Sequence, residues 1–136
     1  MAKLPQEARE LFESVSSVVF STANADGQPN SCIVGMKKVI DNETVYLSDQ
    51  FFNKTLANVR ENAKVAVVWW GEGGAYELHG TARYVNEGPE FEELRTWANE
   101  AFASKGMPIT AKGGVFVSVD AVFTSSPGPQ AGNQIA

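Results

Sequence analysis

Hydrophobic positions along the chain follow two spacings, one helical and one alternating. Apolar residues from Leu4 to Val15 recur every three or four positions, so the chain is expected to open with a short helix. Later segments rich in β-branched and aromatic residues predict six strands. These strands are expected at about Val18–Ala23, Asn30–Ile40, Thr44–Ser48, Val65–Trp70, Ala75–Val85 and Val115–Phe123.

The residues between these strands indicate antiparallel connections. Asn24–Gly27 and Asp41–Glu43 are typical of tight hairpin turns. Two further helical patterns begin near Lys54 and Pro89. The segment Val65–Trp70 is apolar enough to predict a central strand that is covered on both sides. Six strands joined mainly by hairpins, with three short helices, predict a mainly β antiparallel barrel or sandwich.

Length and composition indicate one domain, expected at residues 1–123, followed by a tail at residues 124–136. The 136 residues and 43% hydrophobic content are ordinary for a single folded domain. The tail is rich in Gly, Pro, Ser, Gln and Asn, so it is not expected to form regular structure. It nevertheless carries no charge and contains Ile135, which suggests that it packs over another surface.

Charge and cysteine content exclude several classes of site. The formal net charge is −5 and the 11 basic residues are scattered, which disfavours nucleic-acid binding. A single cysteine, Cys32, excludes an internal disulfide, and with only one histidine no zinc site is expected. No signal peptide and no membrane-spanning apolar run occur, so the expected location is the cytoplasm.

One stretch, Ser48–Asn62, combines polar chemistry with the start of a helix. Asn53 is placed to cap that helix, and Lys54 and Thr55 fall in its first turn. A cation and a hydroxyl beside free amides, at the positive end of a helix dipole, form a natural phosphate site. The two phenylalanines just before Asn53 would flank a flat ring attached to that phosphate. The alternative is a surface loop that enters the helix, with Lys54 solvated and the two phenylalanines in the core.

Five short segments occur in a recognisable order and cover nearly the whole chain. They are Asp26–Asn30, Lys54–Val59, Leu78–Ala82, Gly88–Glu92 and Ser126–Gly132. In this order they resemble the pyridoxamine 5'-phosphate oxidase-like family of FMN-binding split β-barrels, within it the small FMN-binding proteins. The resemblance implies a six-stranded antiparallel split β-barrel that forms a homodimer, with FMN at the subunit interface.

The same resemblance implies a set of cofactor-binding residues. The matching positions are Ser31, Cys32, Ile33, Val34, Ser48, Asp49, Gln50, Lys54, Thr55 and Asn58. In the family's pattern the first four lie on the strand that runs along the flavin. The next three lie at a strand end whose amides meet the polar edge of the ring, and the last three lie beside the phosphate. Taken from the residues alone, Cys32 is interpreted as a small buried hydrophobe, because it lies in an apolar strand.

The implied function is that of an FMN-binding redox protein, either an electron carrier or an oxidoreductase acting on a small unidentified substrate. No residue pattern marks a catalytic acid, base or nucleophile, which fits a cofactor that carries the chemistry itself. His79 is interpreted as a strand residue facing solvent or a neighbour. The alternatives are a flavin-binding or sensing module without turnover, and a split barrel that has lost its cofactor.

Oxidation of pyridoxamine phosphate is disfavoured. The vitamin B6 oxidases of the family hold the substrate phosphate with added basic residues near the C-terminus, whereas this chain has no Arg, Lys or His after Lys112. Larger members also carry a phosphate-binding arginine on the second strand, where this chain has Met36, Lys37 and Lys38.

Overall fold

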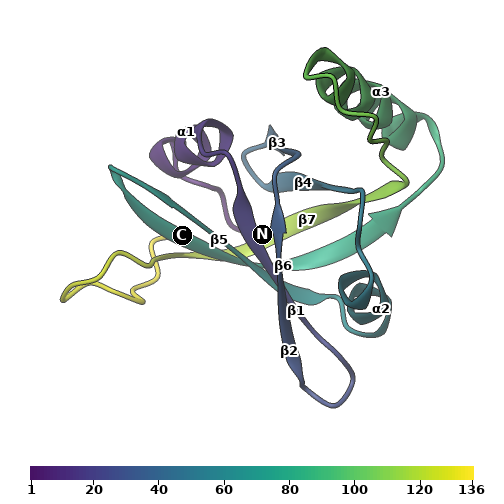
Figure 1. Ribbon diagram of the computed structural model, residues 1–136. Helices are drawn as coiled ribbons and strands as arrows, with labels where there is room; N and C mark the ends of the chain where they lie inside the picture. Colours follow the sequence, from purple (N-terminus) through teal and green to yellow (C-terminus); the bar gives the residue numbers. More distant parts are fainter.

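The computed structural model describes residues 1–136 as a single antiparallel sheet with three helices (Figure 1). The elements in chain order are α1 (Gln6–Ser14), β1 (Val18–Ala23), β2 (Pro29–Val34), β3 (Lys37–Asp41), β4 (Thr44–Asp49), α2 (Lys54–Glu61), β5 (Lys64–Gly71), β6 (Gly74–Val85), α3 (Pro89–Ser104) and β7 (Gly113–Thr124). The three predicted helices are therefore confirmed, as is the mainly β antiparallel class.

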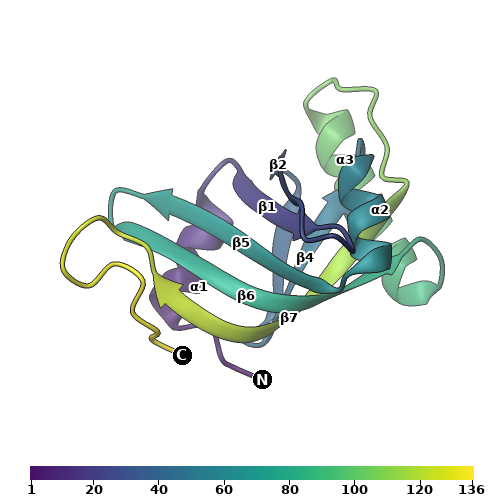
Figure 2. The ribbon, with the colours of Figure 1, turned by 90° about the horizontal axis from the view of Figure 1, so that it is seen from below.

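The seven strands follow the order β2-β1-β5-β6-β7-β4-β3, and every neighbouring pair is antiparallel. The sheet curls strongly, and β5, β6 and β7 run side by side along its middle (Figure 2). Its two edge strands, β2 and β3, are consecutive in the sequence but are not paired with each other. The result is a split β-barrel.

The prediction of one long strand at Asn30–Ile40 is wrong, because the structure divides it at Gly35 and Met36. Its first part pairs with β1 and its second part pairs with β4, at opposite edges of the sheet. A continuous strand cannot reach both edges, so the chain must leave one and join the other between Val34 and Lys37. This break raises the strand count from six to seven.

The main core lies inside the curl and is closed at one end by α1. Ala8 and Phe12 of α1 have no exposed surface and join the largest apolar cluster. The indole Nε1 of Trp69 donates to the carbonyl oxygen of Ala8 at 2.9 Å, and the Phe12 ring packs edge-on against the indole at 5.2 Å. A buried indole N–H needs such an acceptor, so this bond fixes α1 against β5.

The expectation that β5 is covered on both sides is wrong for the single chain. Val65, Val67 and Trp69 point into the core and are buried, whereas Trp70 is 57% exposed. One face of β5 packs against the interior of the barrel and the other is only half-buried. The continuous apolar pattern therefore reflects one covered face and one apolar face that is only partly covered in the single chain.

The helix α3 packs outside the barrel, on the other face of β4 and β7. Leu94 contacts Tyr46 and Phe116, whose rings lie 5.0 Å apart. Its C-terminal half packs beside Met36 and Ala111, which brings the end of α3 next to the break between β2 and β3. In Figure 1, α2 and α3 lie at the same end of the sheet, and α1 lies toward the other end.

The tail forms no helix or strand after Thr124, as the sequence predicts, but it is held against the sheet by backbone hydrogen bonds. The chain turns after Thr124 and runs back along β7, where Phe123 and Gln134 form an antiparallel bridge. The amide of Ile135 donates to the carbonyl of Val122 at 2.8 Å, and the amide of Val122 donates to the carbonyl of Ala136 at 3.0 Å. These bonds satisfy the part of the β7 edge that lies beyond β4, so backbone pairing orders the tail despite its composition.

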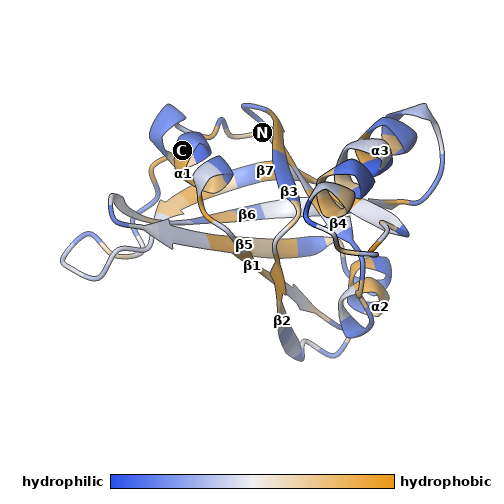
Figure 3. Cartoon of the chain, turned by 45° about the horizontal axis from the view of Figure 1, so that its top comes forward, coloured by the Kyte–Doolittle hydropathy of each residue, from blue (hydrophilic) through white to orange (hydrophobic).

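Hydrophilic residues lie along the outside of α1, and hydrophobic segments recur along the strands (Figure 3). None of the three helices combines the length and the apolar character that a membrane-spanning helix requires.

Candidate functional site

A groove of about 560 Å³ lies where β2, the start of α2 and the end of α3 meet. Small-molecule sites typically fall between about 300 and 1,000 Å³, so the groove is large enough for a cofactor. Two lysines, Lys54 and Lys105, line it, and no Asp or Glu does. In a chain with a net charge of −5 this local excess of positive charge favours an anionic ligand.

The start of α2 opens onto the groove without a side-chain cap. Asn53 occupies the capping position, but its side chain makes no capping hydrogen bond, so the predicted cap is wrong. The preceding segment is held instead by Asp49, whose Oδ1 accepts from the Phe52 amide at 2.8 Å. The first amides of α2 are thus left for a ligand or water. Lys54 follows directly and is exposed.

Thr55 is fixed against the neighbouring strand. Its side chain is nearly buried, and its Oγ1 accepts a hydrogen bond from Nδ2 of Asn30 at 3.2 Å. The sequence pattern did not identify Asn30 as a site residue. It also lines the groove, and through this bond it connects β2 with the first turn of α2.

The four predicted residues of β2 all line the groove. β2 is an edge strand that pairs only with β1, so its outer N–H and C=O groups have no strand partner. Ile33 is 68% exposed on this edge, and Ser31 Oγ lies 2.9 Å from Ser21 Oγ. Burial raises the pKa of the Cys32 thiol, although a hydrogen bond with Thr55 opposes this effect, so the thiol stays protonated at neutral pH.

The end of β4 contributes Ser48 and Gln50 but not the side chain of Asp49. The Gln50 amide donates to Ser48 Oγ, and both residues line the groove. Asp49 has no exposed surface and lies behind the groove. Asn58 also lies outside it, because its Nδ2 donates to Thr22 Oγ1 at 3.0 Å and thereby attaches α2 to β1.

Eight of the ten predicted positions therefore come together around the groove, and two do not. The side chains of Asp49 and Asn58 instead form buried hydrogen bonds that hold the elements around it. The binding role of each of the ten residues stays a prediction.

The two phenylalanines before α2 have different environments. Phe51 is 78% exposed at the rim of the groove. Phe52 is nearly buried, and its ring packs against Phe20 at a centroid distance of 5.9 Å. Only Phe51 is therefore free to cover a flat ligand, while Phe52 anchors the segment to the core.

The opposite wall of the groove comes from the end of α3 and the loop that follows. Its members are Phe102, Lys105, Met107 and Ile109. Phe102 lies in the last turn of α3, and the remaining three residues follow the end of that helix. No local motif marks these residues, because their approach to β2 depends on the packing of α3 against Met36.

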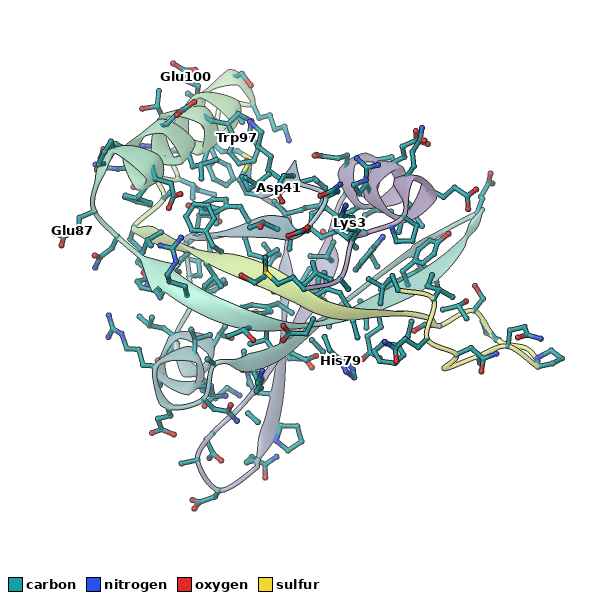
Figure 4. All side chains as sticks on the ribbon, turned by 180° about the vertical axis from the view of Figure 1, so that it is seen from behind. Lys3, Asp41, His79, Glu87, Trp97 and Glu100 are labelled. Atoms are coloured by element: carbon teal, nitrogen blue, oxygen red, sulfur yellow. The ribbon has the colours of Figure 1, made fainter.

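The side chains of Lys37, Lys38 and His79 contact other parts of the molecule. The Lys37 ammonium donates to the carbonyl of Val15 at 2.6 Å, and burial lowers the pKa of this ammonium group. The Lys38 ammonium lies 5.1 Å from the centre of the Trp97 ring. His79 projects from the side of the sheet away from α1 and α3, and its ring lies 4.5 Å from that of Phe123 (Figure 4). None of these residues lines the groove.

Comparison with known proteins gives related sequences and related folds. The sequence pattern of the family described as pyridoxamine 5'-phosphate oxidase matches residues 4–123. An uncharacterized protein of Methanocaldococcus jannaschii is 34% identical over 139 residues, which covers 100% of this chain and 90% of that protein.

Among solved structures, HupZ of Group A Streptococcus superposes with a TM-score of 0.77 at 24% identity, covering 95% of this chain and 99% of that one. An FMN-binding protein from Syntrophomonas wolfei superposes with a TM-score of 0.74 at 17% identity, covering 89% of this chain and 85% of that one. At these identities the two structures support the fold alone.

Proposed function

The chain belongs to the pyridoxamine 5'-phosphate oxidase family, and we propose that it is an FMN-binding redox protein. One observation carries this proposal: the uncapped start of α2, with Lys54 beside it, opens into a groove that no acidic residue lines. The binding of FMN by the similarly folded protein from Syntrophomonas wolfei is consistent with it.

The phosphate of FMN fits the start of α2. The free amides of the first turn donate hydrogen bonds, the helix dipole adds a partial positive charge, and Lys54 adds a full one. The Thr55 hydroxyl, which already accepts from Asn30, can donate its own proton to a phosphate oxygen.

The ring system fits the remainder of the groove. The unpaired edge of β2 offers backbone donors and acceptors to its polar rim, and Ser48 and Gln50 lie at the adjacent strand end. Phe51 and Phe102 provide apolar surface on different elements. A flat ring with one polar edge needs both kinds of contact.

FMN, when bound, supplies the electron transfer, and the chain's own residues bind it and orient it. The ionisable side chains that line the groove are Cys32, Lys54 and Lys105, and none of them hydrogen-bonds to a neighbouring acid or base that would activate it for proton transfer. This composition favours an electron carrier or an oxidoreductase that passes hydride directly between substrate and flavin. Oxidation of pyridoxamine phosphate is disfavoured, because Lys37 and Lys38 are engaged away from the groove.

We further propose that two copies of the chain form a homodimer around the flavin. Ile33 and Phe51 are large apolar side chains that are 68% and 78% exposed at the groove. A second copy placed over this rim would bury both side chains and restrict the access of solvent to the ring.

The test begins with the absorption spectrum of the purified protein and titration of the apoprotein with FMN. Flavin absorbance and saturable binding of one FMN per chain are expected. Anaerobic reduction by a panel of donors, including NADH and NADPH, then separates a redox protein from a binding module without turnover. Failure to bind added FMN at micromolar concentration would leave only the interpretation of a barrel that has lost its cofactor.

A further inference from the structure

We propose that Asp49 and Tyr84 are positioning residues, which hold the segment between β4 and α2 so that the start of α2 is open to a phosphate. The inference rests on the proposed function, because it concerns the same groove. It assigns a role to two side chains that do not line that groove.

Asp49 is the last residue of β4 and has no exposed surface. Its Oδ1 accepts from the Phe52 amide at 2.8 Å, and its Oδ2 accepts from the Tyr84 hydroxyl at 2.7 Å. The carboxylate thus joins the connecting segment to β6, a strand that pairs with β5 and β7 inside the sheet. A buried carboxylate with two short hydrogen bonds has little freedom to move.

Lys112, the residue just before β7, completes a clamp that also includes Asp49 and Tyr84. Its ammonium donates to the carbonyl of Phe52 at 3.2 Å and lies 4.0 Å from Oδ1 of Asp49. Its backbone amide donates to the carbonyl of Asp49 at 2.9 Å. Both the N–H and the C=O of Phe52 are therefore bound by side chains, and the direction in which the chain enters α2 is fixed.

Tyr84 contacts both Asp49 and Arg60 of α2. Its hydroxyl binds Asp49, and the guanidinium of Arg60, in the last turn of α2, lies 5.5 Å from the centre of its ring. A side chain on Gly113 would collide with this ring, so glycine leaves the space that Tyr84 occupies. Burial and the adjacent Asp49 raise the pKa of the Tyr84 hydroxyl, which keeps it a proton donor at neutral pH.

The clamp provides hydrogen-bond partners for the N–H and C=O of Phe52, just before α2. It provides none for the amides in the first turn of the helix. Asn53, the residue in the capping position, leaves the first amides of the helix without a side-chain partner. A helix start in a folded protein is usually capped. Here the chain enters α2 in a fixed direction although no side chain caps these amides, so they are available to a phosphate.

The experiment measures the dissociation constants of FMN and riboflavin for the apoprotein by flavin fluorescence, together with the midpoint of thermal unfolding. For Asp49→Ala we expect FMN affinity to fall about tenfold or more, a change of about 1.4 kcal/mol. Riboflavin lacks the phosphate, so its affinity should fall by less than about threefold. Tyr84→Phe should change the ratio of the two constants in the same direction.

Two further variants separate positioning from general stability. Asp49→Asn keeps an oxygen that can accept from the Phe52 amide, so it should retain most of the preference for FMN. Trp69→Phe removes a buried hydrogen bond far from the groove, to Ala8, and serves as the destabilised control with an unchanged preference. Equal losses for FMN and riboflavin in Asp49→Ala, or a lost preference in Trp69→Phe, would overturn the inference.

If Asp49→Ala does not fold, the inference is tested by the ratio of the FMN and riboflavin dissociation constants of Tyr84→Phe, because that variant loses a single hydroxyl. Failure of the proposed function is recognised separately, since the unmodified protein would then show no preference for FMN over riboflavin. A preference that is present in the unmodified protein and intact in Tyr84→Phe would reject the positioning role alone.

Discussion

Asn30 on the edge strand β2 donates a hydrogen bond to Thr55 in the first turn of α2, with Nδ2 and Oγ1 3.2 Å apart. Thr55 is only 3% exposed, so its side chain has little freedom to move. Lys54, one residue earlier, is exposed and makes no ion pair with any acidic side chain. The two residues thus combine a buried hydroxyl with a free cation.

Replacing Lys54 with alanine is expected to weaken FMN binding and leave the fold intact. A charge-assisted hydrogen bond contributes about 1.5–3 kcal/mol, so FMN affinity should fall about tenfold to a hundredfold. Riboflavin should bind both proteins almost equally. Lys64→Ala is the matched control, because it removes the same charge from an exposed pair with Asp120 outside the groove. An equal loss for riboflavin would show that Lys54 does not act on the phosphate.

Self-association is the second prediction. Sedimentation of the FMN-bound protein should show a dimer at micromolar concentration, with an interface above about 2,000 Å² in total. Phe51→Glu should weaken the dimer, because it places a charge at the exposed rim of the groove. Ile40→Glu, at an apolar residue that is 41% exposed outside the groove, should not. A stable monomer with bound flavin would contradict the proposal.

Much of the fold follows from local sequence, because each prediction that holds depends on neighbours along the chain. The turn at Asn24–Gly27 is one example: Asn24 Oδ1 accepts from the amides of Asp26 and Gln28, and Gly27 has φ 84°. The start of α3 is another, with Pro89 in the first turn of the helix.

The wrong predictions concern features that depend on contacts between residues far apart in the sequence. Asn53 is a favourable capping residue, but Asp49 and Lys112 bind the preceding peptide and set the chain direction instead. The wall of the groove that includes Phe102 and Lys105 depends on how α3 docks on the barrel, which no local pattern encodes. The alternation within β2 and β3 likewise gives no signal for the crossing between the two edges of the sheet.

Glycine at position 80 is expected to be required by packing. The register between β6 and β7 shifts between His79 and Gly80, and a Cβ at Gly80 would overlap Val117 and the carbonyl of Ser118. Gly80→Ala should therefore lower the free energy of unfolding by about 1–3 kcal/mol, the usual cost of overpacking. Gly73→Ala is the control, since nothing lies within 4 Å of the place that its methyl group would occupy. Urea unfolding compares the two, and equal stabilities would refute the packing argument.

Alkaline pH should destabilise the protein partly through Tyr46. Burial raises the pKa of Tyr46 to about 12, above the value of about 10 expected in the unfolded chain. The folded state then binds the proton more tightly, so the stabilisation is complete below pH ~10 and is lost as the pH rises toward 12. The free energy of unfolding should decrease across this interval.

Tyr46→Phe tests this origin. The Tyr46 hydroxyl is buried without a hydrogen-bond partner, so its removal should leave stability at pH 7 unchanged or slightly raised. The decrease in unfolding free energy above pH ~10 should become shallower, because one titrating group is removed. Tyr76→Phe, at a partly exposed ring, is the control. Identical pH profiles for Tyr46→Phe and the unmodified protein would exclude Tyr46 as a contributor.

The last prediction concerns the tail, which we propose to lie near the flavin of the partner subunit. In the single chain the tail does not reach the groove, and residues 132–136 run along β7 instead. Its turn at residues 127–132 is exposed and contains two glycines at positive φ, Gly128 and Gly132, which permit close approach to another surface.

Deleting residues 127–136 should loosen FMN and speed the reaction of the reduced flavin with oxygen, measured by stopped flow. The deletion also removes the backbone bonds to Val122 and Thr124, so the unfolding midpoint should fall as well. Gly80→Ala keeps the tail and is destabilised at the bulge of β6, outside the groove, so it shows how much of the change in binding comes from stability alone. If flavin affinity and oxygen reactivity change no more in the truncated protein than in Gly80→Ala, the tail serves only to complete the edge of β7.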